Sequence, residues 1–449
     1  MIGKGQPMKR IFCIFLILML LCGCAEDTPE TLSVCIDGNG LNEMYLGPIL
    51  AEFEQQNPNI KLEVNYLPPY KADDPAMIER RSAAFTRTRT ELMSGKGADI
   101  YLFLGAYGSA SSADSYMLFP DLERNILSGA LHDLGFLFEH EDFRGSDYVG
   151  GLTETGVSDG KPYVLPLSYQ IFGLVGVDSA LTESGFDTTQ TNPVKFTQQL
   201  LELGEKCPYL GTYCHTLLLN STATPPVSAQ NAQILLQEPQ WQQIFELIRQ
   251  LQGGTGGENG DFASFLDYTT AAQNGAALLP GASFSMCAHS LRVLEDAGHT
   301  TRFLGFPNEH GGVTVQPYVT AVVSAGCRNT DATAELLLWL LSDTVQGCKE
   351  LEFVGSRANL SFNGFSWPVR RGSAKDMLEQ LKVYPVEPGA ISETLKADLT
   401  ALEGRIDTFR ISSRYDTSLY SLVERYLRGE QSWEECWAGI TDAWNYLDE

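Results

Sequence analysis

Hydrophobic positions near the start of the mature chain alternate between two periods, one typical of strands and one typical of helices. The apolar run 32–36 is followed by the turn-forming cluster 37–40 (Asp-Gly-Asn-Gly), which is how a short buried strand ends. The next apolar positions have the spacing of the buried face of a helix: Leu46, Ile49, Leu50 and Phe53. The pattern predicts a strand followed by a helix that ends before Asn57 and Pro58.

The same alternation continues through the next fifty residues. Residues 60–66 alternate as a half-buried strand, and a second helix is expected over roughly 75–94. Residues 100–104 form a fully apolar strand that breaks at Gly105. Strand, helix, strand, helix, strand is the order of an α/β fold with a parallel sheet and right-handed crossovers. Loops at the carboxyl ends of such strands are where α/β sheets bind ligands.

Later segments add strands and several amphipathic helices. We expect strands at 160–167, 173–177, 276–279 and 318–325, and a strongly apolar helix over 332–346 that is buried nearly all round. Near the end, Ser432 and Glu435 fit a helix capping box. A stripe at helical spacing follows it and is predicted to be core packing, not a sugar-stacking surface: Trp433, Trp437, Ile440 and Trp444.

The amino-terminal segment reads as an export signal and is set aside from the fold. Lys4, Lys9 and Arg10 precede the apolar run 11–21, which is well under the ~20 residues that span a bilayer. Leu-Cys-Gly-Cys at 21–24 resembles the end of a bacterial lipoprotein signal, so we expect residues 1–23 to be a signal peptide, Cys24 to be lipidated and 24–31 to be a tether. The alternative is that Cys22 and Cys24 end a signal anchor as small hydrophobic residues. The start codon, Met1 or Met8, is left open.

Charge and cysteine content narrow the class of protein. The chain has 31 Lys and Arg against 56 Asp and Glu, and removal of residues 1–23 takes away three basic residues and no acidic one, which leaves a net charge of −28. Such an acidic surface argues against nucleic-acid binding. Seven cysteines would remain beyond Cys24, an odd and scattered set that is no disulfide framework. A disulfide between Cys207 and Cys214 is left open, and the others are expected to pack as small hydrophobic residues.

Motifs for catalysis and for metals fail on their context. Residues 156–160 satisfy G-x-S-x-G, but a nucleophile elbow needs a helix after it and a Pro-containing strand follows here, so we interpret the segment as a turn. The sequence has no Walker A motif, no H-E-x-x-H and no C-x-x-C. The acidic run 139–142 around His140 is interpreted as a solvated face. We therefore expect no enzymatic activity, no cofactor and no metal.

Six short segments, in order, resemble the extracellular solute-binding proteins of ABC importers, family 1, the group of maltose-binding-protein-like sugar-binding lipoproteins. Residues 93–101 are similar to the family's "sGkgPDi" element, with Ala98 replacing the usual Pro, and residues 160–166 match its "GKxYgLP" element. The other matching segments are 274–280, 324–346, 364–373 and 427–435. Together they extend over nearly the whole mature chain.

The resemblance implies a two-lobed periplasmic-binding-protein-like α/β fold (type II), with three interlobe crossovers and a ligand cleft between the lobes. We place the crossovers near Leu167–Ile171, Thr301–Asn308 and Gly326–Asp331. The N-terminal lobe is expected to hold residues 32–168 and 304–326, and the C-terminal lobe residues 169–303 and 331–449.

The resemblance also implies a function without bond making. A monomeric receptor would close on a small-molecule solute, most simply a sugar, and deliver it to ABC permease subunits while its lipid holds it on the outer face of the cytoplasmic membrane. Two alternatives stay open. A sensor lipoprotein would present the solute to a signalling partner, and a secreted glycoside hydrolase would hold two carboxylates across the cleft.

Loops at strand ends supply the aromatic and planar polar groups that a carbohydrate needs. The candidate ligand-binding residues are Asp37, Asn39, Tyr70, Tyr107, Tyr169, Gln170, Ser283, Phe284, Trp367 and Tyr415. The alternatives are helix capping for Asp37 and Asn39 and hinge or loop packing for Tyr169 and Trp367. We expect a neutral or weakly polar ligand with Trp367 and Tyr169 as aromatic surfaces, although Arg370 and Arg371 beside Trp367 weaken that argument.

Overall fold

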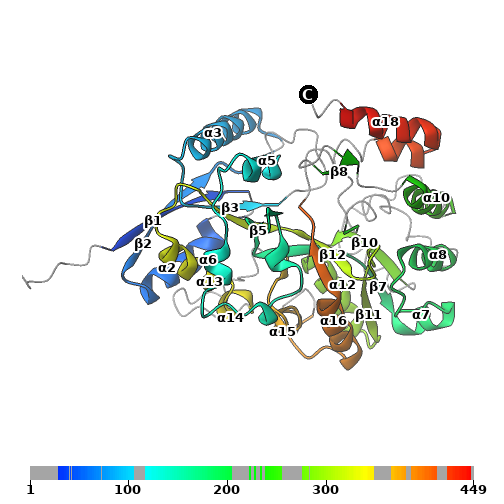
Figure 1. Cartoon of the computed structure of the whole chain (residues 1–449). Helices are drawn as coiled ribbons and strands as arrows, with labels where there is room; N and C mark the ends of the chain where they lie inside the picture. The colour runs from blue at the N-terminus through cyan, green and yellow to red at the C-terminus, as the bar shows by residue number, and fades with distance from the viewer. Residues whose placement is uncertain are drawn as a thin grey trace, which may run out of the picture.

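The structure is a computed structural model, and two mixed sheets, each covered by helices, organise it (Figure 1). It describes residues 29–39, 41, 43–71, 73–105, 117–204, 222–223, 227–228, 233–234, 238–254, 276–282, 284–347, 366–380, 386–411 and 422–445. The leader and Cys24 lie outside these residues. No helix within the described ranges is long and apolar enough to cross a membrane.

The first sheet has the strand order β2-β1-β3-β13-β6. Its strands are β1 (Glu30–Asp37), β2 (Ile60–Leu67), β3 (Ile100–Leu104), β6 (Leu165–Pro166) and β13 (Val319–Val323). β1 pairs in parallel with β2 and β3, while β13 is antiparallel to β3 and β6. The three predicted strands at 32–36, 60–66 and 100–104 are therefore confirmed, and their carboxyl ends share one edge.

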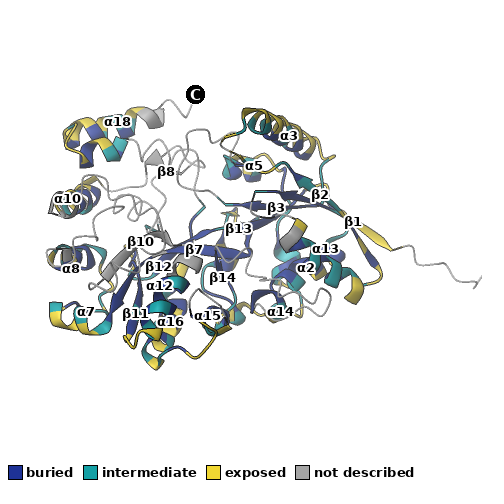
Figure 2. Cartoon of the chain, turned by 180° about the vertical axis from the view of Figure 1, so that it is seen from behind, coloured by how far each residue is buried: buried dark blue, intermediate teal, exposed yellow. Residues whose placement is uncertain are grey.

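Alternation along β1 divides the first sheet between two layers of helices. Val34 and Ile36 pack on the side of α2 (Glu43–Gln56), α6 (Gly135–Phe138) and α13 (Thr330–Leu340). Cys35 lies on the opposite face with α3 (Pro75–Met93) and α5 (Leu122–Leu127). Because both faces are covered, the central strands β3 and β13 are fully buried, as Figure 2 shows in dark blue. We call this sheet and its helices the first lobe.

The second sheet is built around the long strand β7 (Ser168–Val177). The strands that pair with β7 are β10 (Ala276–Ala282), β11 (Thr301–Gly305), β12 (Val313–Pro317) and β14 (Trp367–Pro368), and β15 (Ile406–Phe409) pairs with β12. One face carries α7 (Asp178–Ser184), α8 (Pro193–Gly204), α10 (Glu238–Gly254) and α18 (Trp433–Asn445). The other carries α12 (Phe284–Asp296) and α16 (Glu393–Arg405), with α15 (Ser373–Gln380) beside α16. We call this sheet and its helices the second lobe.

Further short elements connect the longer ones. They are η1 (Gly145–Asp147), η2 (Leu152–Glu154), β4 (Val157–Ser158), β5 (Lys161–Pro162), β8 (Val227–Ser228), β9 (Gln233–Ile234) and α14 (Asp343–Gln346). β4 and β5 form a hairpin whose turn is Asp159-Gly160, both with positive φ, so the interpretation of 156–160 as a turn is confirmed.

The chain passes between the sheets at places that differ in part from those expected. It leaves β6 at Leu167 to enter β7, as expected, but the next passage is at Tyr318 between β12 and β13. Residues 304–317 are therefore in the second lobe, where we had expected them in the first. The reason is strand pairing: β11 is antiparallel to residues 173–177 of β7, and β12 is antiparallel to residues 169–171.

The predicted apolar helix over 332–346 also lies elsewhere than expected. It forms α13 and α14, and α13 packs on the first lobe, where Trp339 Nε1 donates a 3.0 Å hydrogen bond to Ile49 O. The third passage therefore comes after α14 and before β14 and not near 326–331. We propose a first lobe of residues 30–167 and 318–347 and a second of 168–317 and 366–445.

Two local predictions are confirmed. Ser432 Oγ accepts from Glu435 N, and Ser432 N donates to Glu435 Oε2, so the capping box is formed. Trp433 and Ile440 of α18 are buried in the second lobe's core, as expected. Cys35, Cys327 and Cys436 are free and buried, and burial raises the pKa of the Cys35 thiol to about 12.

Candidate ligand-binding site

The edge of the first sheet that carries the carboxyl end of β3 has a hollow at the junction with the second lobe. The hollow is partly open to solvent and has a cavity volume of about 10 Å³. Its lining from the first lobe includes Phe103, Gly105, Met117, Phe119 and Thr320, and its lining from the second includes Pro317 and Ile411. Both lobes therefore contribute to one mostly apolar site at the place where α/β sheets bind ligands.

Helix α3 fixes the wall of the hollow. Arg89 donates from Nε to Leu118 O (2.6 Å) and from Nη2 to Met117 O (2.7 Å). Phe119, next along, meets the Phe103 ring edge-to-face at 4.9 Å. These contacts hold residues 117–119 against the carboxyl end of β3.

Gly105 lets the first lobe approach the second passage closely. Its N–H donates to Tyr318 O at 2.6 Å, and a Cβ on Gly105 would lie 2.1 Å from Pro317 O. Only glycine fits there. Nearby, Thr320 is 1% exposed, and its Oγ1 has no hydrogen-bond partner within the part of the chain that the structure describes.

Asp37 lies at the end of β1, where we expected a ligand contact, but its carboxylate is buried in an ion pair. It is 1% exposed, and both its carboxylate oxygens accept from Arg81, at 2.6 and 2.9 Å. Arg81, itself fully buried, also donates to Pro68 O at 2.5 Å and lies over the Phe85 ring. The pair thus ties together the loops that follow β1 and β2.

Two candidates in those loops are partly exposed and stay predictions. Asn39 N donates to Asp37 Oδ1 at 3.0 Å, so the buried ion pair positions Asn39. Tyr70 follows β2 and is half-buried. Both are at the edge that the hollow occupies.

Tyr169 and Trp367 are fully buried, so the expectation that they are aromatic surfaces for a ligand is wrong for this arrangement of the lobes. The two residues face each other across β7 and β14, and their rings stack at 6.4 Å. Trp367 also stacks on Phe303, and Tyr169 meets Phe409 edge-on. Burial raises the pKa of Tyr169 well above its ordinary value. These rings are core of the second lobe.

Gln170 lies on the face of β7 opposite to Tyr169, where it begins a row of polar side chains across neighbouring strands. It pairs with Gln316 of β12, and the two side chains are 6% and 5% exposed. Arg410 continues the row, because it follows the β15 residue that pairs with Val315, and its N–H donates to Val315 O. Arg410 Nη1 donates to Thr222 Oγ1 at 3.0 Å. The amide of Gln316 and the guanidinium of Arg410 thus belong to neighbouring strands. Each residue directly precedes one that lines the hollow, Pro317 and Ile411.

Sequence reasoning missed Gln316 and Arg410. Each is a polar residue that ends or follows an apolar strand, which was the available signal, but the pairing that aligns them with Gln170 is not local. The other candidates, Tyr107, Ser283 and Tyr415, lie outside the described residues, as does the side chain of Phe284. In the described ranges, no three His, Cys, Asp or Glu side chains gather as metal ligands would.

Comparison with known proteins shows the fold. No protein-family model and no curated protein matches the chain. An extracellular solute-binding protein family 1 structure from Alicyclobacillus acidocaldarius matches with a TM-score of 0.63 at 14% identity, over 94% of this chain and 99% of that one. The sugar-binding protein MalE from Xanthomonas citri matches with a TM-score of 0.62 at 16% identity, over 93% and 96%.

A third match is the cyclic α-maltosyl-1,6-maltose binding protein from Arthrobacter globiformis, with a TM-score of 0.57 at 14% identity, over 93% of this chain and 99% of that one. The chain thus has the two-lobed α/β fold of the periplasmic-binding type, as its sequence predicted. A designed cysteine esterase is also similar, with a TM-score of 0.59. The fold alone therefore does not decide between binding and catalysis.

Proposed function

We propose that this protein is the substrate-binding lipoprotein of an ABC importer, which captures an extracellular carbohydrate by closing its lobes. The observation that carries the proposal is the hollow that both lobes line, with the polar row of Gln170, Gln316 and Arg410 beside it. A ligand held there contacts both lobes at once, so it stabilises the closed arrangement.

The chemistry of the junction suits a sugar. Phe103, Met117 and Phe119 offer apolar surface for C–H faces, and the amides of Gln170 and Gln316 can donate to and accept from hydroxyl groups. Similar structures are described as binding sugars, among them a chitin oligosaccharide binding protein. These likenesses support a carbohydrate as the solute.

Thermal-shift measurement on the purified mature chain tests this function. Maltotriose, chitotriose and galactose are the probes, matched with glucose 6-phosphate and glucuronate as anionic competitors. A glycan at 100-fold over its Kd should stabilise the fold by ~2.7 kcal/mol. Binding of the anionic sugars with no response to any neutral glycan would contradict the carbohydrate proposal.

Anchoring is tested separately. The short apolar run and the Leu-x-Gly-Cys ending support lipidation of Cys24. Cys24→Ala should release the protein from the membrane fraction or stall its processing, with Cys22→Ala as the matched control. Normal processing and unchanged membrane retention of Cys24→Ala would contradict the anchor.

A further inference from the structure

A single buried side chain connects the first passage between the lobes to both the first lobe and the second. Gln346, in the last turn of α14, is 2% exposed. Its Nε2 donates to Leu167 O at 3.0 Å, in the first passage, and to Leu340 O at 2.9 Å, at the end of α13. Its Oε1 accepts from Val369 N at 2.9 Å, directly after β14 in the second lobe.

The second passage is tied to the first by another buried polar side chain. Ser168 is 1% exposed, and its Oγ accepts from Val319 N at 3.0 Å. The backbones also pair there, because Tyr318 N donates to Ser168 O and Leu167 N to Val319 O, both at 2.8 Å. Through Leu167 and Ser168, the first two passages and Val369, which follows the third, form one hydrogen-bonded unit.

Gln346 holds this unit to the first lobe. Both amide hydrogens and the amide oxygen have partners, so the buried side chain is satisfied and its position is defined on three sides. Leu340 belongs to α13, which packs on the first sheet. Because the same amide holds Leu167 and Val369 to that helix, the first passage and the second lobe cannot move independently at these two residues.

We propose that Gln346 is the positioning residue of the hinge: it fixes the axis about which the lobes close and thereby pre-organises the cleft. The inference rests on the proposed function, because it assigns the closing motion to that same site. Gln346 does not line the hollow. Gln346 therefore affects binding by changing the fraction of molecules in the binding-competent arrangement. The apparent Kd is the intrinsic Kd divided by that fraction.

This mechanism has a signature that neither a ligand contact nor a merely structural residue shares. A residue that touches the ligand changes the affinities of different ligands by different factors. A hinge residue changes every affinity by the same factor, because the competent fraction is common to all ligands. A residue that only stabilises one lobe leaves the lobe-to-lobe distance unchanged.

The test is Gln346→Met, which keeps the length of the side chain and removes all three hydrogen bonds, with Gln346→Glu as a second variant that keeps an acceptor for Val369 N. Single-molecule FRET between labels introduced as unnatural amino acids at Thr86 of α3 and Glu434 of α18 reports the lobe-to-lobe distance without ligand. Arg302→Lys, in the second lobe and away from the passages, is the control for lost stability.

In either Gln346 variant we expect a broader distance distribution in the ligand-free protein than in the wild type and in Arg302→Lys. The affinities for maltotriose and chitotriose should fall by one common factor, about tenfold. A wild-type distribution in both variants, or unequal factors for the two glycans, would overturn the inference. The distance measurement needs no ligand, so it decides the inference even where neither glycan binds, an outcome that would contradict the proposed function alone.

Discussion

The indole of Trp367 and the ring of Phe303 lie 5.1 Å apart and 7° from parallel, in the interior of the second lobe. Tyr169 stacks on the same indole at 6.4 Å. Because the three rings come from β14, β11 and β7, the indole joins strands that are distant in sequence. Trp367→Ala should lower the free energy of unfolding by about 3–5 kcal/mol, through lost burial and the cavity left behind.

Urea denaturation measures this loss. Trp437→Ala is the matched control, because Trp437 is only partly buried at the edge of the second lobe's other core and should cost less. If Trp367→Ala kept the stability of the wild type and lost only glycan affinity, the indole would be a ligand contact after all, as its sequence position had indicated.

The buried ion pair of Asp37 and Arg81 should be far more sensitive to the loss of one partner than to the loss of both. Asp37→Asn leaves the guanidinium without a counter-charge in a fully buried position and should cost about 3–5 kcal/mol of unfolding free energy. The double variant Asp37→Asn with Arg81→Met should recover part of that loss. Arg87→Gln, in an exposed pair with Glu91, is the control and should change stability by less than ~1 kcal/mol. Additive losses in the double variant would contradict this account.

How far the sequence predicts the fold depends on whether a feature is local. The strands β1, β2 and β3 were predicted within a few residues, because apolar alternation and turn residues are read within one segment. The passage at Tyr318 was not predicted, because β11 and β12 join the second lobe through pairing with β7, more than a hundred residues earlier in the chain. The order of the six family-like segments along the sequence does not determine which strands pair.

The candidate site shows the same division. Sequence reasoning placed the candidate binding residues at the ends of the strands, and Asn39 follows the carboxyl end of β1 there. It could not separate an aromatic ring that stacks on a ligand from one that stacks on other rings, as Trp367 does. It also could not foresee that Arg81, in the middle of a helix, would neutralise Asp37. Both outcomes depend on contacts between distant segments.

Thr320 should be one of the few buried residues whose hydroxyl lowers stability. Its Oγ1 is buried and has no hydrogen-bond partner among the described residues, and an unmade bond of this kind costs about 1–3 kcal/mol. Thr320→Val should therefore raise the free energy of unfolding. Thr333→Val is the matched control: Thr333 is fully buried, but its Oγ1 donates to Asn329 O at 2.8 Å, so this variant should be destabilised. Losses of equal size in the two variants would refute the assignment of Thr320.

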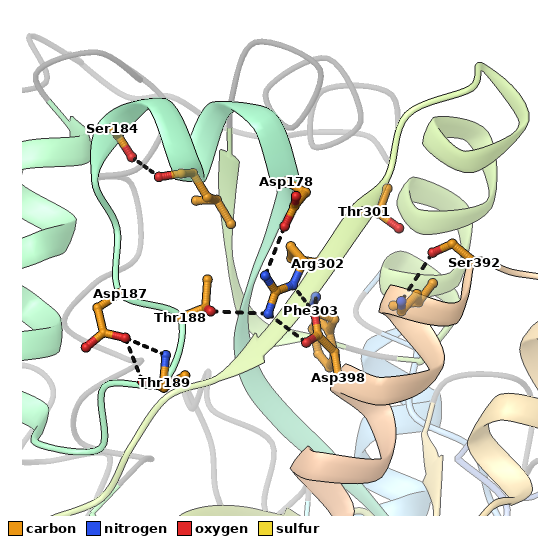
Figure 3. Close-up of polar contacts among 12 residues, drawn as sticks. Asp178, Ser184, Asp187, Thr188, Thr189, Thr301, Arg302, Phe303, Ser392 and Asp398 are labelled. Atoms are coloured by element: carbon orange, nitrogen blue, oxygen red, sulfur yellow. Dashed lines mark hydrogen bonds and ion pairs between the residues drawn. The ribbon is translucent and has the colours of Figure 1, made fainter.

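Arg302 connects three parts of the second lobe (Figure 3). Its guanidinium donates to Asp398 of α16 at 2.7 and 2.9 Å, to Asp178 at 2.9 Å and to Thr188 at 3.2 Å. Lysine cannot reproduce this planar fork. Arg302→Lys should cost about 1.5–3 kcal/mol of unfolding free energy, measured in urea, by losing charge-assisted hydrogen bonds. Arg428→Gln, at the exposed pair with Glu424, should cost less than ~1 kcal/mol, and an equal loss would show that the planar fork of Arg302 adds nothing.

The carboxylate of Glu403 should give the stability of the protein a pH dependence of defined sign. Glu403 is 8% exposed, and burial raises its pKa above the ordinary 4.5, although both oxygens accept from Gly372 N. Between the ordinary pKa and the raised pKa of the folded state, the folded protein binds more protons than the unfolded chain. The stabilisation is therefore complete below pH 4.5 and is lost as the pH rises through the folded-state pKa.

Glu403→Gln removes this titration and keeps an acceptor for Gly372 N. Urea denaturation from about pH 4 to about pH 8 should show a smaller fall of the unfolding free energy with rising pH in the variant than in the wild type. Asp187→Asn is the control of opposite sign, because hydrogen bonds from Thr189 lower the pKa of the exposed Asp187, whose contribution is lost only as the pH falls below its ordinary 3.8. Identical pH profiles for the wild type and Glu403→Gln would mean that the carboxylate at this helix end is as well solvated in the folded protein as in the unfolded chain.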